Sequence, residues 1–175
     1  DALTDGDNNT ALGAFSLSAD TKGDKSVAVG VVALASQNFT TVTDTYNTAV
    51  GYQAGGSVTT GIQNTIIGSL AGDALTDADL NVAVGYGALT SDTLGSKSVA
   101  IGHTTLANQN FTTATDSLNT AVGHSAGSAV TTGSSNTLIG GQTGDALTQG
   151  VRNTAVGVAA LTADTLGQTA VAIGY

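Results

Sequence analysis

The chain has 175 residues, of which 10% are charged and 4% aromatic, and it contains no Pro, Cys, Met or Trp. All 13 acidic residues are Asp, and with four Lys and Arg they give a formal net charge of −9. So few and dispersed cations argue against nucleic-acid binding and against peripheral binding to anionic membranes. The absence of Cys excludes disulfides, thiolate catalysis and Cys-based zinc sites. No apolar run approaches the ~18 residues of a membrane helix, so we expect no membrane insertion in this segment.

A glycine preceded by Leu, Val or Ile recurs along the chain at intervals of 17 or 21 residues. Before it comes a short alternating segment such as Thr48-Ala49-Val50, which predicts a brief strand that ends at a glycine corner. We call these the rung glycines: Gly13, Gly30, Gly51, Gly68, Gly85, Gly102, Gly123, Gly140, Gly157 and Gly174. A strand, a corner, a second strand and a return at a fixed interval predict an all-β parallel β-solenoid or β-roll. We expect about ten rungs, each one turn of the coil, stacked ~4.8 Å apart into a rod of roughly 45 Å.

The rungs are grouped into a longer repeat of 72 residues. Residues 1–72 and 73–144 are identical at 43 positions without a gap, and residues 145–175 begin a third unit. We therefore expect one continuous solenoid that is a piece of a longer chain. Four residues after the rung glycine, pairs of Leu alternate with pairs of Gly, which predicts extra core side chains in some rungs and second corners in others: Leu17, Leu34, Gly55, Gly72, Leu89, Leu106, Gly127, Gly144 and Leu161.

The strand pattern predicts which side chains face inward. The residues one and three before the rung glycine lie on the same side of a strand, and they are aliphatic, or Thr and Val. We expect this side to fill the interior, with Val50 and Val122 in the core. Two alternatives stay open for the Ala between them: close packing of neighbouring chains, or a fit to a tight interior. The Asn that recurs four before the rung glycine predicts a ladder of stacked side-chain amides.

Three phrases resemble the repeated Ser-Val-Ala-Ile-Gly phrase of a known family: residues 26–30 (Ser-Val-Ala-Val-Gly), 98–102 (Ser-Val-Ala-Ile-Gly) and 170–174 (Ala-Val-Ala-Ile-Gly). That family is the YadA-like head domains of trimeric autotransporter adhesins, and similar repeats occur in phage and viral tail fibres. The resemblance implies a left-handed parallel β-roll, three parallel chains around one axis, and an extracellular or cell-surface location, or one in a virion fibre. It implies a structural or adhesive fibre segment, with a host surface, matrix or glycan as ligand.

The two 21-residue rungs carry the candidate binding surfaces. Their four extra residues predict outer loops over 35–46 and 107–118, and we expect Asn38, Phe39, Asn110 and Phe111 to contribute to attachment. Asn-x-Thr sequons begin at Asn38 and Asn110 and also at Asn8.

Other chemistry has weaker support. His103 and His124 share a column with Tyr residues, which favours a surface ladder over metal binding or titration. The Asp groups at 5–7 and 73–79 favour solvated loops over calcium binding. With no convergent set of nucleophile, base and acid, we expect no enzyme activity, metal or cofactor. The alternative functions are a monomeric solenoid that binds ice or polysaccharide, and a self-polymerising filament. Ice binding is disfavoured because the best Thr row is expected to face inward.

Overall fold

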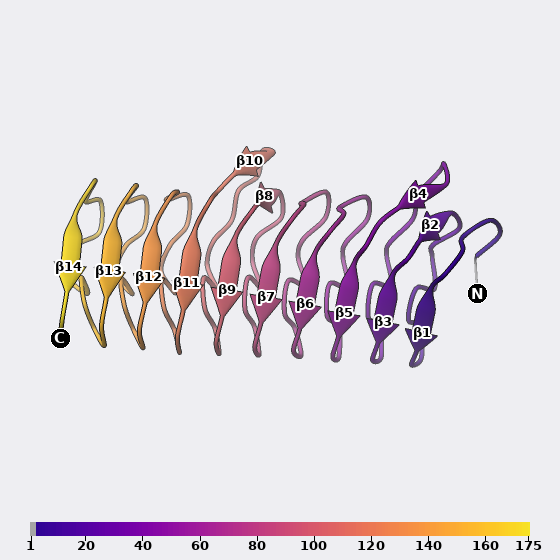
Figure 1. Ribbon diagram of the computed structural model, residues 1–175, viewed down its shortest axis with the longest axis horizontal. Helices are drawn as coiled ribbons and strands as arrows, with labels where there is room; N and C mark the ends of the chain where they lie inside the picture. The colour runs from indigo at the N-terminus through magenta and orange to yellow at the C-terminus, as the bar shows by residue number, and fades with distance from the viewer. Residues whose placement is uncertain (1–2) are drawn as a thin grey trace.

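A computed structural model describes residues 3–175 as one parallel β-solenoid that contains no helix in this range (Figure 1). Asp1 and Ala2, which open the first 72-residue unit, lie outside the described residues. The strands are β1 (Thr10–Leu12), β2 (Gly23–Asp24), β3 (Val27–Val29), β4 (Thr43–Asp44), β5 (Thr48–Val50), β6 (Thr65–Ile67), β7 (Val82–Val84), β8 (Gly95–Ser96), β9 (Val99–Ile101), β10 (Thr115–Asp116), β11 (Thr120–Val122), β12 (Thr137–Ile139), β13 (Thr154–Val156) and β14 (Val171–Ile173). The predicted solenoid of about ten rungs is confirmed.

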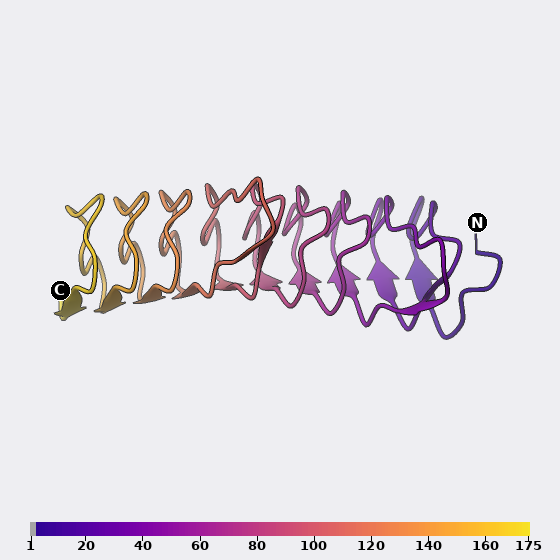
Figure 2. The ribbon, with the colours of Figure 1, turned by 90° about the horizontal axis from the view of Figure 1, so that it is seen from above.

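One sheet runs the length of the rod. Its ten strands pair in parallel in chain order, β1-β3-β5-β6-β7-β9-β11-β12-β13-β14, each three residues long. Every Ala or aliphatic residue at a strand centre pairs with the centre of the next strand, so no rung slips relative to its neighbour. Figure 2 shows these strands on one face while the rest of each rung returns over the other. The expected second strand occurs in the described residues as the short pairs β2–β4 and β8–β10 at the long rungs.

The side chains of this sheet face opposite to the prediction. Ala49, at the centre of β5, is 0% exposed, whereas Thr48 and Val50 on either side are half-buried and point outward. The same pattern holds in the other central strands, where the middle residue is buried. The expectation that Val50 and Val122 belong to the core was therefore wrong. The open question about the Ala column is answered, because it lies inside the coil.

The interior is narrow, and this sets the choice of Ala. Ala33, Ala54 and Ala88 line the opposite wall at 0% exposure, so two walls of small side chains close on each other. A bulkier inward residue needs space from its neighbours. Ile66 replaces Ala at the centre of β6, and a Cβ on Gly55 would lie 2.9 Å from its Cδ1. The predicted alternation of Leu and Gly is thus a volume match: Gly55 and Gly72 both lie against Ile66, and Gly127 and Gly144 both lie against Leu138. In the rungs away from these two bulky side chains, Leu stands in place of Gly.

The rung glycines form the corner that follows each strand of the sheet. All ten have φ between +125° and +141°. A Cβ on Gly51 would lie 2.6 Å from the carbonyl carbon of Gly68 in the next rung. An L-residue here would need both an unfavourable backbone conformation and a shift of the neighbouring rung. The regular glycine spacing is therefore a requirement of close stacking.

Buried Asn side chains tie successive rungs together, as predicted. Asn64 Nδ2 donates to the carbonyl of Ala78 at 2.8 Å, and its Oδ1 accepts from Asn81 N at 2.9 Å. The same bonds recur at Asn47 and Asn136. Every buried side-chain N or O atom in the described residues has a hydrogen-bond partner. The amide ladder therefore fixes the register of one rung on the next.

Candidate functional site

The outer side of the ten-stranded sheet is a regular surface that runs the length of the rod. It presents two columns, which together we call the sheet face: Thr or Val three residues before each rung glycine, and Leu, Val or Ile one residue before it. None of these side chains is charged. Ile67 and Ile101 are each 39% exposed, and Ile173 on the last strand is 78% exposed. No other segment of residues 3–175 covers this side of the sheet. Contiguous apolar surface of this kind is typical of interaction sites.

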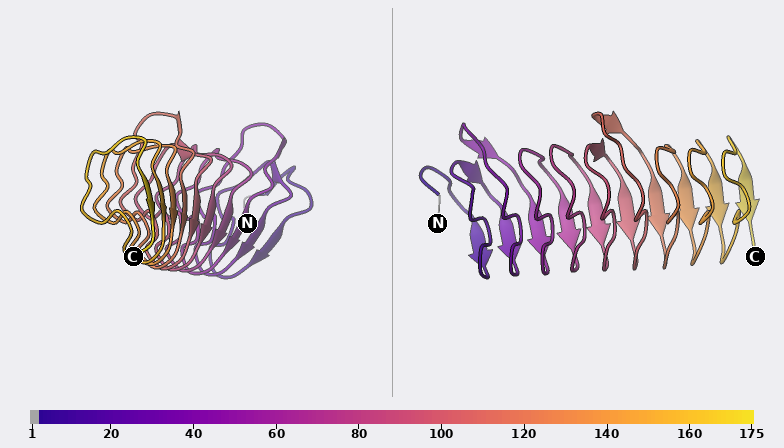
Figure 3. Two further views of the ribbon diagram at one scale, coloured as in Figure 1. Left: turned by 60° about the vertical axis from the view of Figure 1, so that its left-hand side comes forward. Right: turned by 180° about the vertical axis from the view of Figure 1, so that it is seen from behind.

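The two long rungs project loops beyond the body of the rod. Figure 1 shows β4 and β10 standing out from the same edge, and both views of Figure 3 show the two projections separated along the stack. The tips consist of Thr40, Thr41 and Val42 in the first loop and residues 112–114 in the second, all exposed. Because the loops are four rungs apart, the spacing between them is roughly 19 Å.

Phe39 and Phe111 do not form part of the exposed tips. Each is 7% exposed, so the expectation that these rings present a binding surface was wrong. Buried apolar rings hold the base of the loop to the body, which leaves the Thr residues to face solvent. Asn38 and Asn110 are exposed as expected, and each Oδ1 accepts a hydrogen bond from a Thr hydroxyl of the preceding rung, at 3.2 and 3.1 Å.

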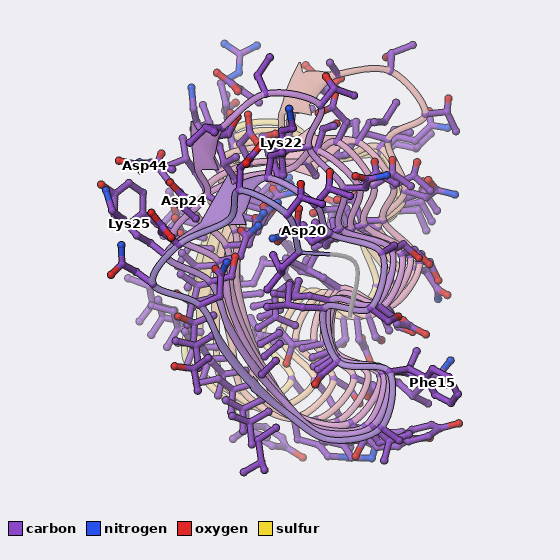
Figure 4. The ribbon with its side chains drawn as sticks, turned by 90° about the vertical axis from the view of Figure 1, so that its right-hand side faces the viewer. Phe15, Asp20, Lys22, Asp24, Lys25 and Asp44 are labelled. Carbon is purple, nitrogen blue, oxygen red and sulfur yellow. The ribbon has the colours of Figure 1, made fainter. Side chains whose placement is uncertain are left out.

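A buried carboxylate anchors each loop, and sequence reasoning missed it. Asp20 is 0% exposed and accepts hydrogen bonds from Gly23 N at 3.0 Å and from Gln37 Nε2 at 2.5 Å. It also accepts from Phe39 N at 3.4 Å, and Asp92 repeats this arrangement. Figure 4 shows Asp20 inside the coil, in contrast to the outward Lys25 and Asp44. The recurring Asp-x-x-Gly spacing was the available signal.

An ion pair fastens the far side of the first loop. Lys25 Nζ lies 2.5 Å from Asp44 Oδ2, which also accepts from the Tyr46 hydroxyl at 2.9 Å. The hydrogen bond from Lys25, then that from Tyr46, lowers the pKa of Asp44 below its ordinary value of 3.8. The Asp44 contact in turn raises the pKa of Lys25. Lys97 and Asp116 form the same pair in the second loop.

Aromatic and imidazole side chains occupy several positions directly after the rung glycines. Tyr86, His103 and His124 lie on successive rungs, all exposed. The centroids of Tyr86 and His103 are 5.2 Å apart with an interplanar angle of 20°, and those of His103 and His124 are 5.3 Å apart at 8°. The stacked surface ladder expected from the sequence is therefore present.

The Asp groups make separate contacts. Asp73 accepts from the Thr90 hydroxyl and Asp77 from the Thr60 hydroxyl, each at 2.6 Å, while Asp79 accepts from a backbone amide. Within residues 3–175, no group of three or more His or Asp side chains is arranged to hold a metal ion.

A second Thr column, nine residues before most rung glycines, was also missed. Its hydroxyls donate to carbonyls of the next rung, as from Thr59 to Thr76 at 3.2 Å and from Thr148 to Thr165 at 3.0 Å. Asn38 and Asn110 take this place in the long rungs. The fixed offset from the rung glycine would have revealed the column.

Comparisons with models of protein families, with curated proteins and with solved structures gave no match. In the described part of the chain, no helix has the length and apolarity needed to span a membrane.

Proposed function

We propose that this chain is a structural segment of an extracellular, non-enzymatic fibre in which three parallel copies pack through their sheet faces. The observation that supports the proposal is the uncharged sheet face of Thr and aliphatic side chains, which extends over all ten strands and which no other segment of the described residues covers. A thin coil with Ala-rich walls buries little apolar surface of its own, and small cores are marginal. Covering the sheet face would add the missing burial.

The occupant proposed for the sheet face is a second and third copy of the same chain. Ten rungs in constant register repeat the same Thr or Val and aliphatic pair at each step. Parallel copies placed side by side therefore match rung to rung along their full length. Rotation about a threefold axis closes such contacts into a ring, so assembly stops at three chains. The resemblance to trimeric adhesin heads supports the same number.

The distribution of charge is compatible with this packing. Despite a net charge of −9, none of the sheet-face positions carries an ionisable group. The ion pairs of Lys25 and Lys97 lie at the loops. Three chains can therefore associate without bringing these charges together. The six projecting tips of a trimer would offer Thr hydroxyls, with Asp44 and Asp116 nearby, to a cell-surface, matrix or glycan ligand, and repeated weak contacts would add through avidity.

Native mass tests the assembly directly. Size exclusion with light scattering should give a particle of three 17.0 kDa chains. Val50→Asp with Val122→Asp should produce a folded monomer, because both side chains point outward. Thr41→Asp with Thr113→Asp is the matched control, since it adds the same charge at the loop tips and should leave the trimer intact. A monomeric unmodified chain would reject the proposed fibre packing.

Ice binding is a second candidate, because the reason for disfavouring it no longer holds. The Thr column three before the rung glycine faces outward, as at Thr65 and Thr137. A flat sheet that alternates hydroxyl and methyl groups, repeated every ~4.8 Å, can order water on its surface. A monomer that inhibits ice recrystallisation would support this function. Thr65→Tyr with Thr137→Tyr should then abolish the effect, while Thr59→Tyr with Thr131→Tyr in the other column should preserve it.

A further inference from the structure

The two imidazoles of the chain lie beside each other on adjacent rungs. His103 and His124 follow Gly102 and Gly123, and their nearly parallel rings face each other at 5.3 Å. Both side chains are exposed. The matching positions of the first unit hold Val31 and Tyr52, so the solenoid does not need imidazole there. Two neutral imidazoles held close together are ligands that transition metals prefer.

Neighbouring hydroxyls orient the first ring. His103 Nδ1 lies 3.2 Å from Thr104 Oγ1, which in turn lies 3.1 Å from Ser125 Oγ. This contact engages Nδ1 and leaves Nε2 of His103 free. Metal-binding His residues commonly have their second nitrogen held in this way, because the contact fixes the ring and its tautomer. Thr104 is thus placed as a positioning residue for His103.

We propose that His103 and His124 together bind one divalent transition-metal ion on the surface of the second unit. Metal–nitrogen bonds of about 2.0–2.1 Å let one ion span roughly 4 Å between two nitrogens. The lone pair of an imidazole nitrogen lies in the ring plane, so the two rings, now stacked at 5.3 Å, must rotate out of the stack until one nitrogen of each points at the ion. Exposed side chains make such rotations within nanoseconds. Water completes the coordination sphere, consistent with the absence of a third His or Asp ligand in the described residues around the pair.

The chemistry of the pair sets the order of affinity. Imidazole sites follow the general series in which Cu²⁺ binds more tightly than Ni²⁺ or Zn²⁺. Ca²⁺ and Mg²⁺ prefer oxygen ligands and should not compete. Tyr86 stacks on His103 at 5.2 Å and is therefore a built-in reporter, because bound Cu²⁺ should quench its fluorescence. The ion would link the two rungs that begin after Gly102 and Gly123, between which the chain forms the loop over 107–118.

The test is a titration of the full chain with CuSO₄, followed by calorimetry and Tyr fluorescence, with NiSO₄ and CaCl₂ for comparison. The matched control variant is His103→Val with His124→Tyr, which installs the residues of the first unit. We expect one Cu²⁺ per chain and a loss of about tenfold or more in affinity when either His is replaced, since chelation is lost. Thr104→Val should weaken binding by about tenfold, while the fold is unchanged.

A gain of binding provides the converse test. Val31→His with Tyr52→His places the pair in the first unit, where Val32 stands in place of Thr104. We expect a second Cu²⁺ per chain, bound more weakly than the first. Binding that survives in the His103→Val, His124→Tyr variant would assign the metal to the Asp residues and overturn the proposal. A stoichiometry of one ion per three chains, or no binding, would overturn it equally.

Discussion

Two adjacent isoleucines test the orientation of the sheet. Ile66 is 0% exposed and lies against Gly55 and Gly72, whereas Ile67 is 39% exposed on the sheet face. Ile66→Ala removes about three buried carbon groups, worth roughly 2.4 kcal/mol in transfer free energy. The glycines beside it have no side chains that could fill the space, so a cavity adds to the loss. We expect a total cost of about 3–4 kcal/mol in the free energy of unfolding.

Ile67→Ala is the matched control because it makes the same chemical change at the next residue. Part of that side chain is already in water and no closed cavity results, so we expect a cost of about 1 kcal/mol. Urea unfolding followed by circular dichroism would measure both, at two protein concentrations that separate folding from association. Equal costs for the two variants at both concentrations would refute the assigned orientation. Leu138→Ala and Ile139→Ala repeat the comparison in the second unit.

Three further predictions follow from the corners and loops. Gly140→Ala should cost about 3 kcal/mol in the free energy of unfolding, because φ is +135° and the new Cβ would meet a carbonyl oxygen at 2.3 Å. Gly141→Ala is the matched control: its Cβ would have its nearest atom at 4.0 Å, so its stability should be within about 0.5 kcal/mol of the unmodified chain. Thermal unfolding measures both. Phe111→Ala should cost about 3–4 kcal/mol in the free energy of unfolding, since the ring is 7% exposed. Thr112→Ala, at the exposed neighbour, is the control. A loss of stability no larger than that of the control would show that the ring of Phe111 is exposed to solvent. The carboxyl carbon of Asp44 should titrate by NMR with a midpoint below 3.8. The contact of Asp44 with Lys25 and Tyr46 therefore stabilises the fold above pH 3.8, and this stabilisation is lost as the pH falls through the lowered pKa of Asp44. A midpoint at or above 3.8 would contradict the lowered pKa.

The period of the chain was predictable because it follows from backbone geometry. A glycine corner that approaches the next rung admits no side chain, so the spacing of the rung glycines reports the length of each turn. The Asn ladder follows for the same reason, since a buried amide needs the same partner in every rung. The alternation of Leu17 and Leu34 with Gly55 and Gly72 was likewise visible in the sequence, as a regular change in side-chain size at one position of the rung.

The alternation of residue types along a strand did not determine which side of the strand faces the interior. A three-residue strand such as Thr48-Ala49-Val50 fits a period of two in either phase, and shifting the phase exchanges the two faces. Hydrophobicity favours Val inside, yet the deciding quantity is the width of the coil, which depends on Ala33 and Ala54 across the interior. Ala33 and Ala54 lie outside the strand segments, and their distance from the strands depends on how each rung closes into a turn. The burial of Phe39 depends likewise on the anchor at Asp20.

The direction of the rung-to-rung hydrogen bonds has a mechanical consequence. The bonds from the Asn ladder and the sheet join each turn to the next, so they run along the rod, parallel to a load applied at its ends. Such a load opens the terminal turn first, and the chain should yield one turn at a time. Each event would release 17 or 21 residues, a gain of about 60 or 70 Å of extended chain. Resistance to pulling in a single chain is then that of one turn, however many turns are stacked, and lateral contact with other chains is what could raise it.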